Sequence, residues 1–75
     1  MKTMTCLQLG GACDLAITGE TFEEVARMSQ NHGTEMFAAN DPSHMEAMNK
    51  MMEIMNLGGM DLWMNERRAE FDRLP

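Results

Sequence analysis

Strand-favouring sequence is confined to the first eighteen residues of this 75-residue chain. Two short segments rich in Thr, Leu and Ile, residues 3–9 and 13–18, flank the pair Gly10-Gly11. Glycine adopts the positive φ angles of a tight turn at little cost, so this pattern predicts a β-hairpin over residues 3–18. A two-stranded hairpin is marginal by itself in water, so the rest of the chain must supply elements that pack on it.

The length of the hairpin loop decides whether the two cysteines share a face. With a two-residue loop, Gln8 lies opposite Cys13 and Cys6 lies opposite Leu15, so both thiols point to one side. A four-residue loop places the two cysteines directly opposite each other. A three-residue loop places them on opposite faces, because a shift of one residue inverts every side chain. The sequence leaves these registers open.

Helical periodicity follows the hairpin. A Thr-x-x-Glu pattern that starts at Thr21 is typical of a capping box and predicts a helix over residues 22–39. Spacings of three and four residues place one set of side chains on its packing face: Phe22, Val25, Ser29, His32 and Met36. Glu23 and Arg27 are expected to form an outward pair one turn apart. His32 is therefore expected on the face that packs and not on the solvated face.

Two further helices are predicted, over residues 42–57 and 60–73. Pro42 separates the second helix from the first, because the residue before a proline avoids the helical region. Either Asp41 or Ser43 can cap the second helix, and a glycine pair ends it. The predicted architecture is an α+β domain, in which an N-terminal β-hairpin packed by a helix is followed by a methionine-rich helix and a short C-terminal helix.

Methionine is unusually abundant, with 11 residues in 75. Four of them form one stripe of the second predicted helix: Met45, Met48, Met52 and Met55. A second apolar stripe, Ala47, Met51 and Ile54, runs beside it. This apolar face is broader than one short helix needs to cover a hairpin, so we predict a homo-oligomer, a dimer or larger, through the Met45/Met48/Met52/Met55 face. Thioethers with His44 could also bind Cu(I), but packing is favoured because copper ligands must be reachable from solvent.

The charge balance excludes several partners. Twelve acidic residues against six basic ones give a formal net charge of −6. Nucleic-acid binders and readers of anionic membranes carry the opposite charge, so neither partner is predicted. No apolar run approaches the roughly 18 residues that span a bilayer, and the first residues lack the apolar core of a signal peptide. We therefore predict a cytoplasmic protein with reduced cysteines.

Cys6, Cys13 and His32 are the one set of side chains with metal-ligand chemistry that the pattern brings together. Thiolates and imidazoles are the ligands that Zn²⁺ and similar transition-metal ions prefer, so this set would supply three ligands. His44, Asp14, a methionine or water could supply the fourth. The competing interpretation is that both cysteines are small buried hydrophobes and His32 is a hydrogen-bonded core residue.

Two stretches and one histidine fall in a shared register: Cys6-Leu7-Gln8-Leu9-Gly10-Gly11-Ala12-Cys13-Asp14, Gly19-Glu20-Thr21-Phe22-Glu23-Glu24-Val25 and His32. With this register, roughly residues 4–37 resemble the family of predicted small metal-binding proteins known as domain of unknown function 1059. The resemblance implies a hairpin followed by a helix, with Cys6, Cys13 and His32 as metal ligands. That family tends to place a second histidine five residues after the first, where this chain has Phe37.

Enzymatic patterns are weak in this sequence. No third residue orients His32 as a base for a cysteine nucleophile, and a chain of this size hardly forms an enclosing pocket. The glycine pair lacks the spacing and the lysine of a phosphate-binding loop. The leading prediction is a small non-enzymatic metal-binding protein with a Cys/Cys/His ligand set. The alternative is a metal-free oligomeric interaction module whose interface is the methionine-rich helix.

Overall fold

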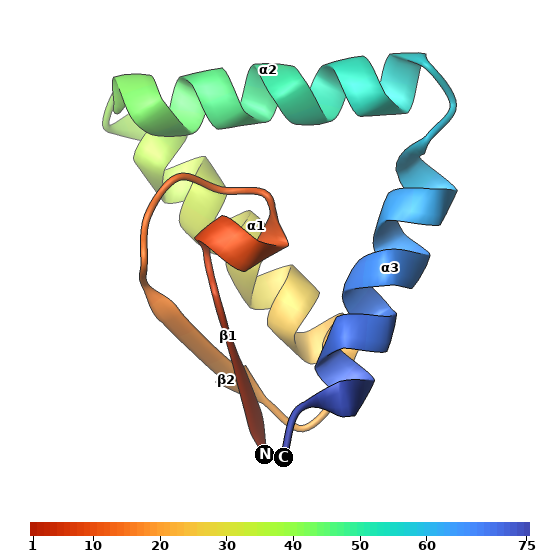
Figure 1. The fold of residues 1–75 in the computed structure, drawn as a ribbon. Helices are drawn as coiled ribbons and strands as arrows, with labels where there is room; N and C mark the ends of the chain where they lie inside the picture. The colour runs from red at the N-terminus through yellow and green to blue at the C-terminus, as the bar shows by residue number, and fades with distance from the viewer.

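The computed structural model describes all 75 residues and shows a two-stranded antiparallel sheet followed by three helices (Figure 1). In chain order the elements are β1 (Lys2–Thr5), the short 3₁₀ helix η1 (Leu7–Leu9), β2 (Ala16–Gly19), α1 (Phe22–Ala38), α2 (Pro42–Asn56) and α3 (Met60–Arg73). The predicted α+β fold class is confirmed, and the helix bounds agree with the prediction to within one residue. None of the helices combines the length and apolar character that a membrane crossing requires.

The hairpin has the register of a two-residue loop, but its ladder is shorter than predicted. Met4 pairs with Ile17, and the Cys6 N–H donates to the Leu15 carbonyl over 2.9 Å. Beyond this point the expected tight turn at the glycine pair is wrong, since Leu7–Leu9 form η1. The Cys6 carbonyl accepts two N–H donors from within the loop, which curls the chain on itself instead of extending the ladder.

Helix α1 packs on the sheet as its periodicity predicts. The Thr21 hydroxyl accepts a hydrogen bond from the Glu24 N–H over 3.1 Å and caps the helix. Phe22 and Val25 are buried, and the other members of the predicted packing face are half-buried. The expected Glu23–Arg27 pair is not formed. Glu23 instead pairs with an arginine of α3, Arg68, because the two helices lie close enough for this longer-range ion pair.

Helix α2 starts from Asp41, one of the two caps that the sequence allowed. The Asp41 carboxylate accepts a hydrogen bond from the His44 N–H over 2.9 Å, and Pro42 occupies the first turn. Asn40 precedes this cap with a φ angle of 58°, which turns the chain out of α1. His44 is the one buried residue of α2, so the helix is anchored to the body of the protein near its first turn.

The apolar core lies between the sheet, α1 and the C-terminal end of α3. It contains seven residues: Met4, Cys6, Leu9, Ile17, Phe22, Val25 and Phe71. The Phe22 and Phe71 rings pack edge to face with their centroids 6.2 Å apart. The two chain ends lie side by side (Figure 1), and the Lys2 ammonium donates to the Asp72 carbonyl over 3.0 Å. The core therefore fastens α3 to the hairpin at the end of the molecule opposite α2.

Replacing Gly33 with alanine should stabilise the protein. Gly33 lies inside α1, and apart from its chain neighbours and the backbone of its own helix no atom lies within 4 Å of the position that an added Cβ would occupy. Because glycine costs a helix about 0.5–1 kcal/mol relative to alanine, Gly33→Ala is expected to raise the free energy of unfolding by about that amount. Urea denaturation followed by circular dichroism measures the change. A variant less stable than the parent would contradict the packing described for α1.

Candidate metal centre

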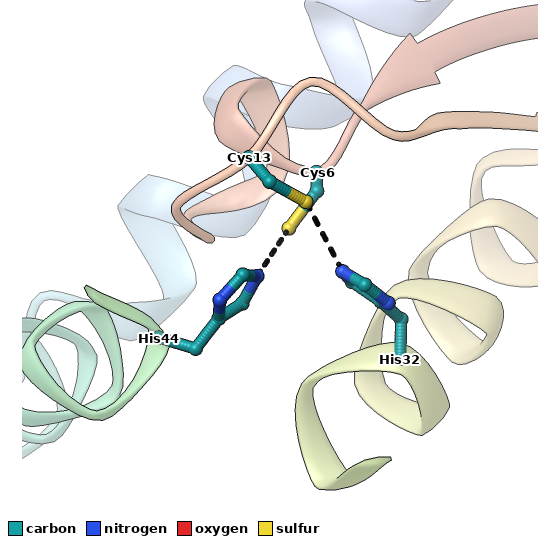
Figure 2. Close-up of side chains that lie close together, drawn as sticks. All are labelled: Cys6, Cys13, His32 and His44. Atoms are coloured by element: carbon teal, nitrogen blue, oxygen red, sulfur yellow. Dashed lines mark hydrogen bonds between the residues drawn. The ribbon is translucent and has the colours of Figure 1, made fainter. Parts of the chain in front are cut away.

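Four side chains with metal-ligand chemistry converge where the hairpin loop meets α1 and α2. These are Cys6, Cys13, His32 and His44, and their ligand atoms all lie within 4.8 Å of one another (Figure 2). Cys6 Sγ is 3.6 Å from His44 Nε2, and Cys13 Sγ is 3.2 Å from His32 Nε2. Figure 2 shows the two rings presenting nitrogen atoms to the two sulfurs from different helices. The four donors therefore surround one small volume.

The spacing of these donors suits a tetrahedral ion. Zinc–sulfur bonds of about 2.3 Å and zinc–nitrogen bonds of about 2.0–2.1 Å place sulfur and nitrogen about 3.6 Å apart across a tetrahedron. The two sulfur–nitrogen distances, 3.6 and 3.2 Å, are close to that value. The widest separation in the cluster, at most 4.8 Å, needs only a small contraction to close around an ion.

The loop between β1 and β2, which carries Cys6 and Cys13 and is called the cysteine loop below, depends on both of its glycines. Gly10 has a φ angle of 91°, which side-chain-bearing residues rarely adopt, and a Cβ there would lie 2.8 Å from Met51 Sδ. A Cβ on Gly11 would overlap Cys6 Sγ. The glycine pair was predicted as the turn of a hairpin. In the structure it lets the loop pass against α2, α3 and the Cys6 sulfur.

His44 is held by a carboxylate on its far side. Its Nδ1–H donates to Asp41 Oδ2 over 2.5 Å, and the same oxygen accepts the His44 backbone N–H. This bond raises the pKa of His44 above its ordinary value of 6.5, although burial acts in the opposite direction. The same bond lowers the pKa of Asp41 below its ordinary value of 3.8. Since Nδ1 carries the bonded proton, Nε2 is left facing the sulfurs, the arrangement common among metal-binding histidines.

The two sides of the cluster differ in exposure. Cys6 and His44 are buried, whereas Cys13 and His32 are half-buried. Cys6 and His44 also line a cavity of about 690 Å³ bounded by the three helices, whose other walls are largely apolar and include Met51.

The three predicted ligands, Cys6, Cys13 and His32, are brought together. Four candidates for the fourth metal ligand were open. The structure places one of them, His44, in the cluster, while Asp14 is exposed outside it. The sequence pattern that could have identified His44 as a ligand is Asp-x-x-His at the start of a helix. In this pattern one carboxylate both caps the helix and holds the histidine ring. Phe37, at the position where the resembled family tends to have its second histidine, is 51% exposed on α1.

Comparison with protein families, with curated proteins and with solved structures finds no match to this chain. The resemblance to the family of predicted small metal-binding proteins therefore stays a prediction, and the geometry of the cluster carries the argument about function.

Replacing Gly11 with alanine should destabilise the protein. The added Cβ would overlap Cys6 Sγ, so the loop must open or the cysteine must leave the cluster. Overpacking of this kind costs about 1–3 kcal/mol, so the free energy of unfolding is expected to fall by that amount in the presence of a chelator. Gly33→Ala is the matched control, because it adds the same methyl group in open space. A Gly11→Ala variant as stable as the parent would contradict the close approach of the loop to Cys6.

The pair formed by Asp41 and His44 should make the stability of the metal-free protein depend on pH. Because folding raises the pKa of His44, the pair contributes stability that is fully present below pH 6.5. This contribution is lost as the pH rises through the raised pKa. Because folding lowers the pKa of Asp41, the pair also contributes stability that is fully present above pH 3.8. This contribution is lost as the pH falls through the lowered pKa. The stability difference between the parent and Asp41→Asn should therefore be greatest between pH 3.8 and 6.5.

Thermal unfolding in chelator at pH values below, within and above this range measures the difference. Asp14→Asn is the control, since it removes an exposed carboxylate outside the cluster. A difference between parent and Asp41→Asn that does not change with pH would contradict the charged pair.

Proposed function

We propose that this chain is a small metal-binding protein that holds one Zn²⁺ ion in a structural site. Cys6 and Cys13 are the thiolate ligands, and His32 and His44 are the imidazole ligands. The observation that carries the proposal is the convergence of the four donor atoms within 4.8 Å, with the His44 ring already oriented by Asp41. Zinc centres commonly have such a carboxylate behind a histidine ligand.

The donor set favours zinc over other common ions. It contains two sulfurs and two imidazole nitrogens and no oxygen, whereas Mg²⁺ and Ca²⁺ require oxygen ligands. A tetrahedral set of two thiolates and two imidazoles is typical of structural zinc. Cu(I) also binds thiolates, so competition between the two metals is part of the test below.

A structural role is supported by the number of protein ligands. Four protein ligands complete a tetrahedron, while catalytic zinc sites keep a fourth position for water or substrate. We therefore infer a non-enzymatic function in which the ion joins three parts of the chain. The ligands come from the hairpin loop, from α1 and from the start of α2.

The small size of the apolar core explains why such an ion would matter. Seven buried hydrophobic residues form the core, and none of them belongs to α2. Small domains with limited cores are commonly stabilised by a metal, because an ion that binds only the folded chain adds its binding free energy to folding. Zinc would connect α2 to the part of the protein that already has a core.

Protein purified without a histidine tag should carry one zinc per chain. Native mass spectrometry measures the stoichiometry, and added zinc should raise the unfolding temperature, since at 100 times the dissociation constant a ligand contributes about 2.7 kcal/mol. Cobalt substitution should give the intense visible absorption of tetrahedral Co²⁺ with thiolate ligands. Cu(I) at a concentration equal to that of zinc should not displace the zinc.

Matched variants identify the ligands. Cys13→Ser and His44→Gln should each abolish stoichiometric zinc, and Asp41→Asn should weaken zinc affinity by about 10- to 100-fold through loss of the carboxylate partner. Asp14→Asn should leave the affinity unchanged, because this side chain is exposed outside the cluster. Failure of the parent protein to retain or take up zinc at neutral pH would refute the proposed function.

A further inference from the structure

The two thiols of the candidate metal centre belong to one short segment, whereas its two imidazoles come from different helices. Cys6 and Cys13 lie in the cysteine loop, His32 lies on α1 and His44 lies on α2. The two Sγ atoms are within 4.8 Å of each other, and Figure 2 shows both on the side of the loop that faces the rings. The fold of a single loop therefore makes the two thiols neighbours.

Backbone hydrogen bonds hold the two cysteines side by side without a metal ion. The N–H of Leu7, the residue after Cys6, donates to the Cys13 carbonyl over 2.8 Å. The Cys6 N–H donates to the Leu15 carbonyl over 2.9 Å, and the Cys6 carbonyl accepts the Gly11 N–H over 2.8 Å. Each cysteine Cα is two covalent bonds from an atom of the first of these hydrogen bonds. Disulfides typically join Cα atoms about 4.4–6.8 Å apart, a separation that this backbone pairing allows.

Neighbouring thiolates can be oxidised together by a hydroperoxide. Cys6 is 2% exposed and Cys13 is half-buried, so the first step falls on Cys13. Its thiolate attacks one oxygen of hydrogen peroxide, which breaks the O–O bond and gives a sulfenic acid and hydroxide. The Cys6 thiolate then attacks the oxidised sulfur, forms the S–S bond and expels a second hydroxide. With two protons taken up, two thiolates and one peroxide give one disulfide and two water molecules.

A disulfide in this loop removes both thiolate ligands in one reaction. Only His32 and His44 would remain, and two imidazoles are half of the four ligands that a structural zinc site requires. The ion would leave as Zn²⁺. Helix α2 would then lose its metal link to the hairpin, because His44 is its one buried residue.

From these observations we propose that Cys6 and Cys13 are a redox modification site, at which a hydroperoxide forms an intramolecular disulfide and releases the bound zinc. The release of zinc rests on the proposed function. The disulfide depends only on the cysteine loop, so it also forms in metal-free protein. A dithiol reductant returns both thiols, becomes oxidised itself and restores metal binding.

Treatment of zinc-loaded parent protein with a small excess of hydrogen peroxide tests the proposal. A colorimetric zinc indicator should register release of the bound zinc, in step with the appearance of a disulfide between Cys6 and Cys13 in peptide mass spectra. The oxidised chain should bind zinc at least about 100-fold more weakly than the reduced chain. Dithiothreitol should restore zinc binding, which distinguishes the disulfide from methionine oxidation, because sulfoxides are reversed by dedicated reductases.

Two single-cysteine variants, compared in chelator, test the order of the steps. Cys6→Ser should form a sulfenic acid at Cys13 that dimedone traps. Cys13→Ser keeps only the buried thiol and should be labelled at least about 10-fold more slowly, because oxidation follows exposure of the thiolate. Circular dichroism checks that both variants are folded. Equal labelling of two folded variants would contradict the first step at Cys13.

Failure of this inference and failure of the proposed function give different results. A reduced parent that takes up no zinc refutes the metal centre, while the disulfide is still measured in the metal-free protein. Three results would overturn the proposal itself. These are metal-free protein in which peroxide forms no disulfide between the two cysteines, zinc-loaded protein that loses its ion without forming this disulfide, and oxidised protein that keeps its zinc.

Discussion

A thiol and an imidazole, both withdrawn from solvent, face each other where the hairpin loop meets the start of α2. Burial of such polar groups is costly unless each finds a partner. Here the Cys6 sulfur lies 3.6 Å from His44 Nε2, and the opposite ring nitrogen of His44 donates to Asp41. The placement of α2 depends on this contact, because His44 is the one buried residue that α2 contributes.

Two separate sets of contacts, at opposite ends of the molecule, therefore hold the protein together. Aromatic packing of Phe22 against Phe71 joins α1, α3 and the hairpin where the chain termini meet. At the other end, sulfur and nitrogen donors take the place of apolar contacts, and an ion bound there would link α2 to the rest. The same division explains the exposed methionines, since a helix held near its first turn by a polar cluster leaves most of its apolar surface uncovered.

Much of this organisation could be predicted from local sequence rules, and the remainder depends on contacts between distant residues. Caps and periodicity predicted the helices, and ligand chemistry predicted Cys6, Cys13 and His32. The shape of the cysteine loop could not be predicted, because it depends on Gly11 lying against Cys6 and on Gly10 lying against Met51. The choice of His44 as fourth donor and of Arg68 as partner of Glu23 likewise follows only once the helices are placed in space.

X-ray absorption at the zinc edge, on protein loaded with one equivalent of zinc, tests the account most directly. The account predicts two sulfur ligands at about 2.3 Å and two nitrogen ligands at about 2.0–2.1 Å, with no water in the coordination sphere. A spectrum with oxygen and nitrogen ligands alone, or with a single sulfur, would show that the two cysteines do not hold the ion together. That result would contradict the four-ligand centre.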